Sequence, residues 1–529
     1  MSLYRNFLSV GGLTLVSRVA GFARDALMAA VLGISPVADA FNAAFRFPNL
    51  FRRLFAEGAF NTAFVPMFST ALEQQGHDAA KELASRIMSW LVAAIAVVTI
   101  LAEIFMPQIM VWFVPGFADD PQKLELTVFL TRVMFPYLAC MSLMSAYAAI
   151  LNSLGRYFAS AFAPVVLNIV NIAALVPLAF LNLPDQADTA FWIAIATMLG
   201  GIAQLALVYG AIRRAGFVPR LRLPRFDPDV RRFWVLAIPA ILAGGITQIN
   251  IFVGTIIAST SDNVISILAY ADRLYQLPLG IVGIAIGTVL LPELSRHIGA
   301  GREAEARASQ SQSLLLAMLL SLPAAVALAT IPVPIIRVLF ERGQFGPEDT
   351  LLTAQALVGY AVGLPAFVLV RVLQPGFFSR QDTRTPTVFA GVSVAANIAI
   401  SLWLFPTLQH LGIALATSAS AWLNVLLLAV FLRRRGHFRM SLSEWRRLAT
   451  ILLVAMVMGA VLYLLAARAA AIFAPGQPIL LQVVALGAIC LFGALTYFTL
   501  AHFSGAQSLG GLVSRLRRRR AKSQTPAGS

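Results

Sequence analysis

The chain has 529 residues, of which 59% are hydrophobic and only 12% are charged. This composition excludes an ordinary soluble domain, in which about 25% of the residues are charged. The formal charge of +16 does not indicate nucleic-acid binding, because the basic residues are scattered among short loops and do not form one domain face.

Apolar runs of about 18 residues or more recur along the chain, and runs of this length predict membrane-spanning helices. The fold class that follows is an all-α polytopic membrane protein. In chain order we place about fourteen spans at residues 10–33, 37–70, 85–113, 124–152, 158–181, 189–212, 233–258, 263–295, 312–340, 350–378, 386–406, 411–432, 448–472 and 478–503.

The distribution of Lys and Arg predicts the orientation of these spans. Alternate loops are basic, with seven arginines between Arg213 and Arg232 and six between Arg433 and Arg447. Such loops face the cytoplasm under the positive-inside rule, which places both termini in the cytoplasm. The intervening loops, including the one expected to carry Lys123, face outward. The tail from Arg515 to Lys522 is a basic cluster suited to anionic membrane lipids.

The second predicted span carries a stripe of polar side chains. They recur in steps of three or four residues, which puts them on one face of a helix. The stripe consists of Asp39, Asn42, Arg46, Asn49, Arg53 and Glu57. A charge at bilayer depth costs at least ~2.5–3.5 kcal/mol on insertion scales, so intramembrane charges are candidates for function. The alternative is that arginine–carboxylate pairs only hold the helices together.

Charges in other spans extend this set. They are Arg52 beside the stripe, Arg18, Arg24 and Asp25 in the first span, and Asp272, Arg273 and Arg371 in the second half of the chain. The seven arginines exceed the four carboxylates by three. An excess of guanidinium groups in a low-dielectric cavity calls for an anionic ligand, and the planar arginine fork suits phosphate or pyrophosphate.

An internal repeat predicts the domain organisation. At an offset of 226 residues, Pro66 recurs as Pro292 and Asn171-Ile172-Ala173 recurs as Asn397-Ile398-Ala399. Six spans separate the copies, so the halves have the same orientation, as in a two-lobed transporter. We expect two six-helix lobes, an extra helix pair and a basic tail, at residues 1–220, 221–440, 441–504 and 505–529.

Motifs for enzymatic chemistry are missing from the sequence. There is no G-x-x-x-x-G-K-[ST] phosphate loop for ATP hydrolysis and no H-E-x-x-H metal motif. Nothing resembles a nucleophile elbow or a catalytic triad. We therefore expect that the protein is not an enzyme and has no metal site and no cofactor. We expect the membrane potential or a coupling ion to be the energy source.

Several motifs closely resemble the MurJ/MviN lipid II flippases along the whole chain. They are Ser17-Arg18, Gly21 to Asp25, Ala38 to Phe41, Pro48 to Leu50, Arg52 to Phe60, Tyr270 to Leu274, Leu290 to Pro292 and Pro375 to Asp382. The resemblance implies the fold of the multidrug/oligosaccharidyl-lipid/polysaccharide exporter superfamily. It implies substrate binding by Arg18, Arg24, Arg52 and Arg273, with Asp39, Arg53 and Glu57 as further functional positions. The residues expected to line or gate the predicted cavity are Asp25, Asp39, Arg46, Asn49, Arg53, Glu57, Asp272 and Arg371.

The function that the resemblance implies is translocation of lipid II, undecaprenyl-pyrophosphate-MurNAc-pentapeptide-GlcNAc. A monomer in the bacterial inner membrane would move it outward by alternating access. A polysaccharide-lipid flippase of the same superfamily would share the cationic cavity. A membrane glycosyltransferase acting on polyprenyl phosphate would also need arginines, but it requires a catalytic carboxylate or metal cluster that we do not find. A drug exporter requires an acidic cavity, and a scaffold protein would not need buried charges.

Overall fold

The computed structural model describes residues 3–53, 61–181 and 185–505. In these ranges the regular structure is helical, and no strand is formed. Glu57 and the basic tail lie outside the described residues. The helices are α1 (Leu3–Leu32), α2 (Pro36–Arg52), α3 (Asn61–Gln74), α4 (His77–Phe113), the 3-10 helix η2 (Pro115–Asp119), α5 (Pro121–Met134), α6 (Tyr137–Ser153), α7 (Phe158–Leu181), α8 (Gln186–Arg214), α9 (Pro228–Ser259), α10 (Val264–Gly299), α11 (Glu303–Thr330), α12 (Pro332–Phe340), α13 (Pro347–Phe378), α14 (Arg384–Arg434), α15 (Leu442–Arg468) and α16 (Ile479–Phe503).

Many of these helices are suited to cross a membrane. Among the described residues, nine are long and apolar enough to do so, and ten if the bent pair Pro228–Ile241 and Gly244–Ser259 forms one span. The charged helix α1 is not among them. Each predicted interval overlaps one helix or two consecutive helices, and residues 386–406 and 411–432 lie on either side of a break at Gln409 in α14. The chain is therefore an all-α multi-pass membrane protein, as predicted.

Two compact units make up the chain. The first comprises Met1–Tyr270, Phe340–Thr350 and Ser401–Ile413, and the second comprises Ala271–Leu339, Leu351–Ile400 and Ala414–Ser529. Each unit is described by itself below.

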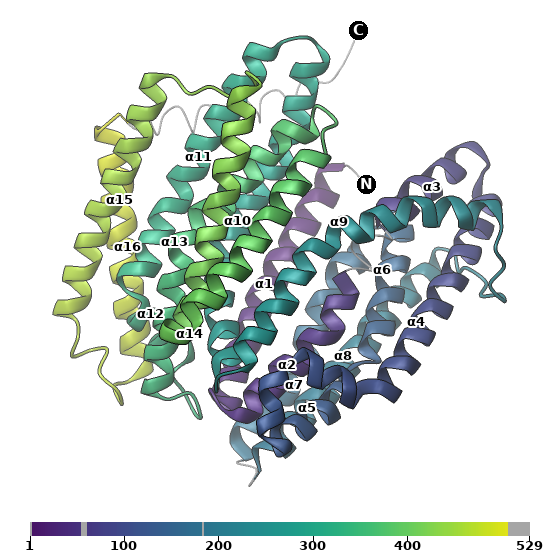
Figure 1. The fold of residues 1–529 in the computed structure, drawn as a ribbon, viewed down its shortest axis with the longest axis horizontal. Coiled ribbons are helices and arrows are strands. Elements are labelled where there is room, and N and C mark those ends of the chain that lie inside the picture. Colours follow the sequence, from purple (N-terminus) through teal and green to yellow (C-terminus); the bar gives the residue numbers. More distant parts are fainter. Residues whose placement is uncertain (1–2, 54–60, 182–184, 506–529) are drawn as a thin grey trace. The chain divides into compact units, whose positions relative to one another are not determined.

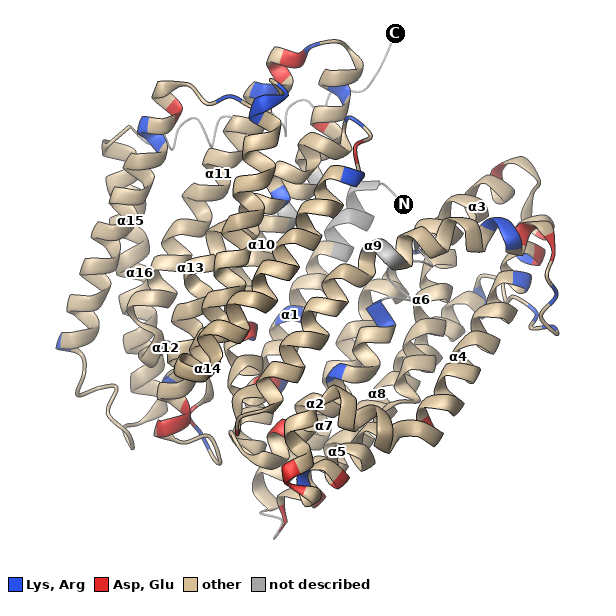
Figure 2. Ribbon diagram, in the orientation of Figure 1, with Lys and Arg blue, Asp and Glu red and all other residues tan. Residues whose placement is uncertain are grey.

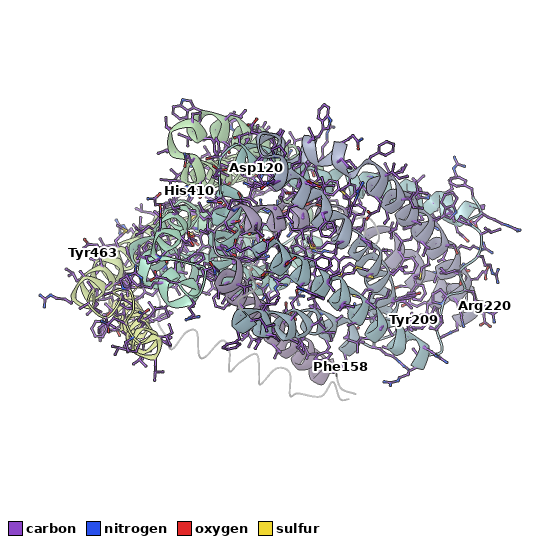
Figure 3. The ribbon with its side chains drawn as sticks, turned by 90° about the horizontal axis from the view of Figure 1, so that it is seen from below. Asp120, Phe158, Tyr209, Arg220, His410 and Tyr463 are labelled. Carbon is purple, nitrogen blue, oxygen red and sulfur yellow. The ribbon has the colours of Figure 1, made fainter. Side chains whose placement is uncertain are left out.

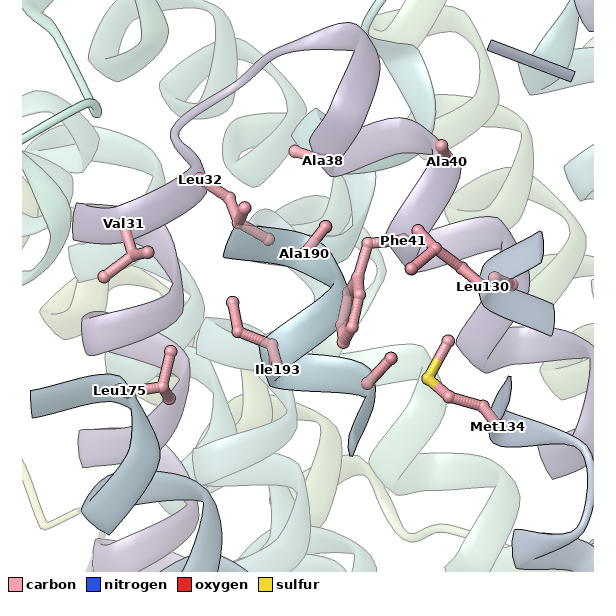
Figure 4. Packing of buried hydrophobic residues seen from close by; sticks show 12 residues of the cluster. Val31, Leu32, Ala38, Ala40, Phe41, Leu130, Met134, Leu175, Ala190 and Ile193 are labelled. Carbon is pink, nitrogen blue, oxygen red and sulfur yellow. The ribbon is translucent and has the colours of Figure 1, made fainter. Parts of the chain in front are cut away.

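The core of the first unit is built from helices that pack along their length. In this unit α1 packs on α7, α7 on α8, and α2 on α5. Figure 4 shows Phe41 of α2 beside Leu130 and Met134 of α5, and all three are buried. In a bilayer such contacts stabilise the unit through van der Waals packing, because lipid tails are as apolar as these side chains. This packing fixes α1 and α2, which carry most of the predicted site residues.

The turn between α1 and α2 sets where the polar stripe begins. Gly33 has a φ of +59°, a conformation that glycine adopts without a Cβ penalty. Ser35 then caps α2 by accepting a hydrogen bond from the Ala38 amide at 3.1 Å, and Pro36 occupies the first helical position. Tyr270 also donates a hydrogen bond to the Gly33 carbonyl at 3.2 Å. The start of α2 is thus held at several points.

In the second unit, the C-terminal helices pack against α11. The Tyr497 hydroxyl of α16 donates a hydrogen bond to the Leu319 carbonyl of α11 at 2.8 Å, and Gly459 of α15 lies against Val326. Helix α15 begins with a capping box between Ser441 and Glu444. These contacts attach the pair α15 and α16 to the rest of its unit.

A candidate anion-binding site on the first two helices

Charged residues lie mostly at helix ends and in loops, but α1 and α2 carry them part-way along (Figure 2). In α1, Arg24 and Asp25 form an ion pair. Asp25 Oδ1 lies 2.7 Å from Arg24 Nη2 and 3.1 Å from Nε. The two side chains are 13% and 11% exposed, so the pair is largely shielded from water. Asp25 thus neutralises part of the charge on Arg24.

Two arginines of α2 have side-chain partners, Arg52 an amide and Arg46 a hydroxyl. Asn49 Nδ2 donates to the Phe45 carbonyl at 2.8 Å, and Asn49 Oδ1 accepts a hydrogen bond from Arg52 Nε at 3.0 Å. Asn49 therefore links Arg52 to the helix backbone. One turn earlier, Arg46 Nη1 contacts the buried Thr255 Oγ1 at 3.4 Å. Arg53, the C-cap residue of α2, is exposed.

At the other end of the stripe, Asp39 is completely buried and has three donors. Its Oδ1 accepts hydrogen bonds from the Ser266 amide at 2.8 Å and the Ser266 hydroxyl at 2.7 Å. Its Oδ2 lies 3.2 Å from Lys123 Nζ. The Lys123 ammonium also lies 4.1 Å from the centre of the Phe117 ring. The carboxylate is therefore compensated within the first unit.

The expectation that Lys123 lies in a loop is wrong. Lys123 is in the first turn of α5, which Asp120 caps by accepting from the Lys123 amide at 3.1 Å. Asp120 is labelled in Figure 3. Its side chain is only 4% exposed. The sequence did contain a signal for this helix start, because Asp120-Pro121 is a typical pair for the N-cap and first helical positions.

Arg18 lines a cavity of about 540 Å³ between α1, α6 and α7. Within the described part of the chain, no hydrogen bond or ion pair engages its guanidinium group. The other lining residues are Thr14, Ser17, Met144, Ser145, Ala148, Ala149, Asn152, Tyr157, Ser160, Ala161 and Pro164. The cavity therefore combines one cation with several hydroxyl groups and an amide, a suitable set for a polar anionic ligand.

The remaining predicted site residues belong to the second unit. Asp272 accepts a hydrogen bond from Gln276, one turn further along α10, and Arg273 is exposed. Arg371 of α13 lies against Gly283 of α10, where an added Cβ would be 2.7 Å from Arg371 Cδ. Among the described residues, no group of three or more His, Cys, Asp or Glu could hold a metal ion.

Comparisons with known proteins identify the family. A family model described as "Lipid II flippase MurJ" matches residues 28–484. The chain belongs to the MurJ family. The protein is thus a transporter and not an enzyme, as its sequence predicted. The matched range begins after Arg18, Arg24 and Asp25, but full-length relatives extend over them.

MurJ relatives match nearly the whole chain. The "Probable lipid II flippase MurJ" of Rhizobium tropici is 47% identical over 521 residues, which is 98% of both chains. The "Lipid II flippase MurJ" of Burkholderia cenocepacia is 34% identical over 510 residues, covering 94% of this chain and 96% of its own.

Solved structures support the same fold. A structure titled "Lipid II flippase MurJ, inward closed conformation" matches with a TM-score of 0.76 and 25% identity, covering 93% of this chain and 98% of its own. An inward-facing multidrug resistance MATE transporter of the MOP superfamily matches with a TM-score of 0.65 and 15% identity, over 81% of this chain and 97% of its own. The second likeness concerns the fold alone.

Proposed function

We propose that this protein translocates lipid II from the cytoplasmic to the outer leaflet of the bacterial inner membrane. The observation that carries the proposal is the MurJ match over residues 28–484 in a chain with arginines inside its spans. Lipid II presents a pyrophosphate between its polyprenyl tail and its sugars. Arginine binds such groups bidentately, and the interaction is stronger in a low-dielectric cavity than in water.

In this mechanism Arg18, Arg24, Arg52 and Arg273 bind the pyrophosphate, while the polyprenyl tail remains in the lipid. Asn49 supports this binding through its contact with Arg52, and Asp25 limits the charge that Arg24 presents to the ligand. Arg46, Arg53, Glu57, Asp272 and Arg371 line or gate the path, and Asp39 supports it by holding the start of α2 through Lys123 and Ser266. Alternating access then exposes the head group at the outer face. A monomer suffices, because a two-lobed transporter encloses its own path.

The membrane potential is the proposed energy source. Each charge that crosses the full potential exchanges about 2.3 kcal/mol per 100 mV. With the cytoplasm negative and both termini on that side, outward movement of an anionic head group is favourable. The inward return of an empty cationic cavity is favourable too. Transport that is unaffected when the potential is collapsed in sealed vesicles would exclude this energy source.

The function can be tested by depleting the protein in its host. New lipid II should then become inaccessible to an externally added enzyme that cleaves its head group. The wild-type gene should restore accessibility, whereas Arg52→Ala and Arg273→Ala at equal membrane levels should not. Ser153→Ala is a matched control, because the Ser153 hydroxyl only bonds the Ala149 carbonyl of its own helix, at 3.0 Å. Unchanged accessibility after depletion would refute the proposal.

A further inference from the structure

The cavity beside Arg18 carries more neutral polar groups than a pyrophosphate needs. Arg18 is the single charged residue among those that line it. The hydroxyl and amide groups come from all three helices around it, namely Thr14 and Ser17 of α1, Ser145 and Asn152 of α6, and Tyr157 and Ser160 at the start of α7. Phosphate sites recruit cations and backbone amides. A lining of neutral donors and acceptors suits a ligand that is rich in hydroxyl and amide groups.

The polar groups at the α6–α7 end of the cavity are held in place by the connecting turn. Gly155, with a φ of +74°, donates to the Asn152 carbonyl at 3.0 Å, and the Arg156 amide donates to the Leu151 carbonyl at 2.8 Å. These bonds close the end of α6. The Ala161 amide donates to the Tyr157 carbonyl at 3.1 Å and begins α7. Asn152 and Tyr157 are therefore presented from fixed backbone positions.

Asn152 has one side-chain hydrogen-bond contact at the cavity. Its amide group lies 2.7 Å from Ser160 Oγ, and the same hydroxyl lies 2.8 Å from the Tyr157 carbonyl. This contact engages one of the two polar atoms of the amide, so the other is available to a ligand. Tyr157 lines the same cavity and is 39% exposed, so an aromatic ring is accessible there. A sugar ring, with apolar faces and a polar edge, matches such a surface.

We propose that this cavity, lined by Arg18, Ser145, Asn152, Tyr157 and Ser160, is a saccharide subsite for the sugar next to the pyrophosphate. The inference rests on the proposed function and adds a recognition element to it. Arg18 binds the phosphate, and Ser145 and Asn152 bind hydroxyl and acetamido groups of the sugar. A volume of about 540 Å³ is within the range of small-molecule sites, about 300–1,000 Å³. A polyprenyl tail would not need these polar groups.

The test compares two ligands that share the tail and the pyrophosphate. Lipid II carries sugars, and undecaprenyl pyrophosphate does not. Binding of each is measured to the purified full-length protein in nanodiscs. Asn152→Ala should weaken lipid II binding about tenfold and leave undecaprenyl pyrophosphate binding unchanged, because a site built for polar ligand groups discriminates through them. Arg18→Ala should weaken both, and Ser153→Ala should change neither.

Ser145→Ala is a second variant, about two turns earlier on the same face of α6, and it should show the same selective loss if Asn152→Ala fails to fold. The subsite is refuted if both variants bind both ligands as the wild type does, or if each variant loses both ligands equally. Failure of the proposed function itself would give a different result, because the wild-type protein would then bind neither ligand.

Discussion

Lys123 Nζ lies 3.2 Å from Asp39 Oδ2, and the two side chains are 4% and 0% exposed. With the Ser266 hydrogen bonds to Asp39, this pair joins α2, α5 and the start of α10 inside the first unit. Charges buried this deeply are stable only while each has its partner, because desolvation costs several kcal/mol per ion. The pair therefore holds α2 against α5 at the end of the stripe that is farther from Arg52.

Removing one partner should be costly. Lys123→Ala leaves a buried carboxylate without its counter-charge, and we expect it to lower the free energy of unfolding by about 3–5 kcal/mol. Thermal or denaturant unfolding of the purified protein measures this. Lys81→Ala is the matched control, because the Lys81 ammonium makes an exposed bond to the Gly216 carbonyl at 3.3 Å. Adding Asp39→Asn to Lys123→Ala should recover much of the loss, and no recovery would contradict the pairing argument.

Asp25 competes with an anionic ligand for Arg24. Asp25→Asn removes the competing charge, so we expect undecaprenyl pyrophosphate to bind about three- to tenfold more tightly, which corresponds to about 0.7–1.4 kcal/mol. Binding to protein in nanodiscs measures the effect. Glu82→Gln, which alters a surface pair with Arg86 and Arg222, serves as the control and should have no effect. Weaker binding by Asp25→Asn would mean that the ion pair positions Arg24 for the ligand.

Asn49 should act through Arg52. Because Asn49 Oδ1 accepts from Arg52 Nε, Asn49→Ala leaves the guanidinium less fixed, and we expect transport to fall by about three- to tenfold, or about 0.7–1.4 kcal/mol. Arg52→Ala should be more damaging. The double variant should transport no worse than Arg52→Ala alone, since residues in one network are not additive. An additive double variant would indicate that Asn49 contacts the substrate independently.

Asp382 lies between α13 and α14, in the second unit, and its ionisation should make the stability of the protein depend on pH. Burial opposes ionisation, but hydrogen bonds from the Thr385 amide and hydroxyl and from Arg435 lower the pKa of Asp382 from 3.8 to about 2. A carboxyl whose pKa is lowered by folding stabilises the protein fully above pH 3.8, and the contribution is lost as the pH falls through about 2. Asp382→Asn should therefore lower the unfolding temperature at pH 7.

The difference between Asp382→Asn and the wild type should shrink below pH 3.8 and be small by pH 2. Unfolding temperatures between pH 2 and pH 7 provide the measurement. The exposed Asp188 supplies a control, since Asp188→Asn should change stability little at any pH. A constant difference for Asp382→Asn across this range would show that its contribution is not electrostatic.

The helices could be predicted from the sequence, because the length and the apolar composition of a span are properties of consecutive residues. The helical stripe from Asp39 to Arg53 was readable for the same reason. Lys123 was missed because its partner Asp39 is 84 positions away, and only the packing of α2 on α5 brings the two together. The cavity beside Arg18 has a similar origin. Ser145 and Asn152 are seven residues apart and share a helix face, but no pattern indicates that α1 lies next to that face.

Reconstitution of the purified protein into sealed liposomes tests the central claim most directly. Fluorescent lipid II is placed in one leaflet, and its arrival in the other leaflet is followed with a membrane-impermeant quencher. We predict transfer by the wild type and by Ser153→Ala, and loss of transfer with Arg52→Ala and Arg273→Ala at equal protein content. Transfer that is equally fast in protein-free liposomes, or in both arginine variants, would contradict lipid II transport through an arginine-lined site.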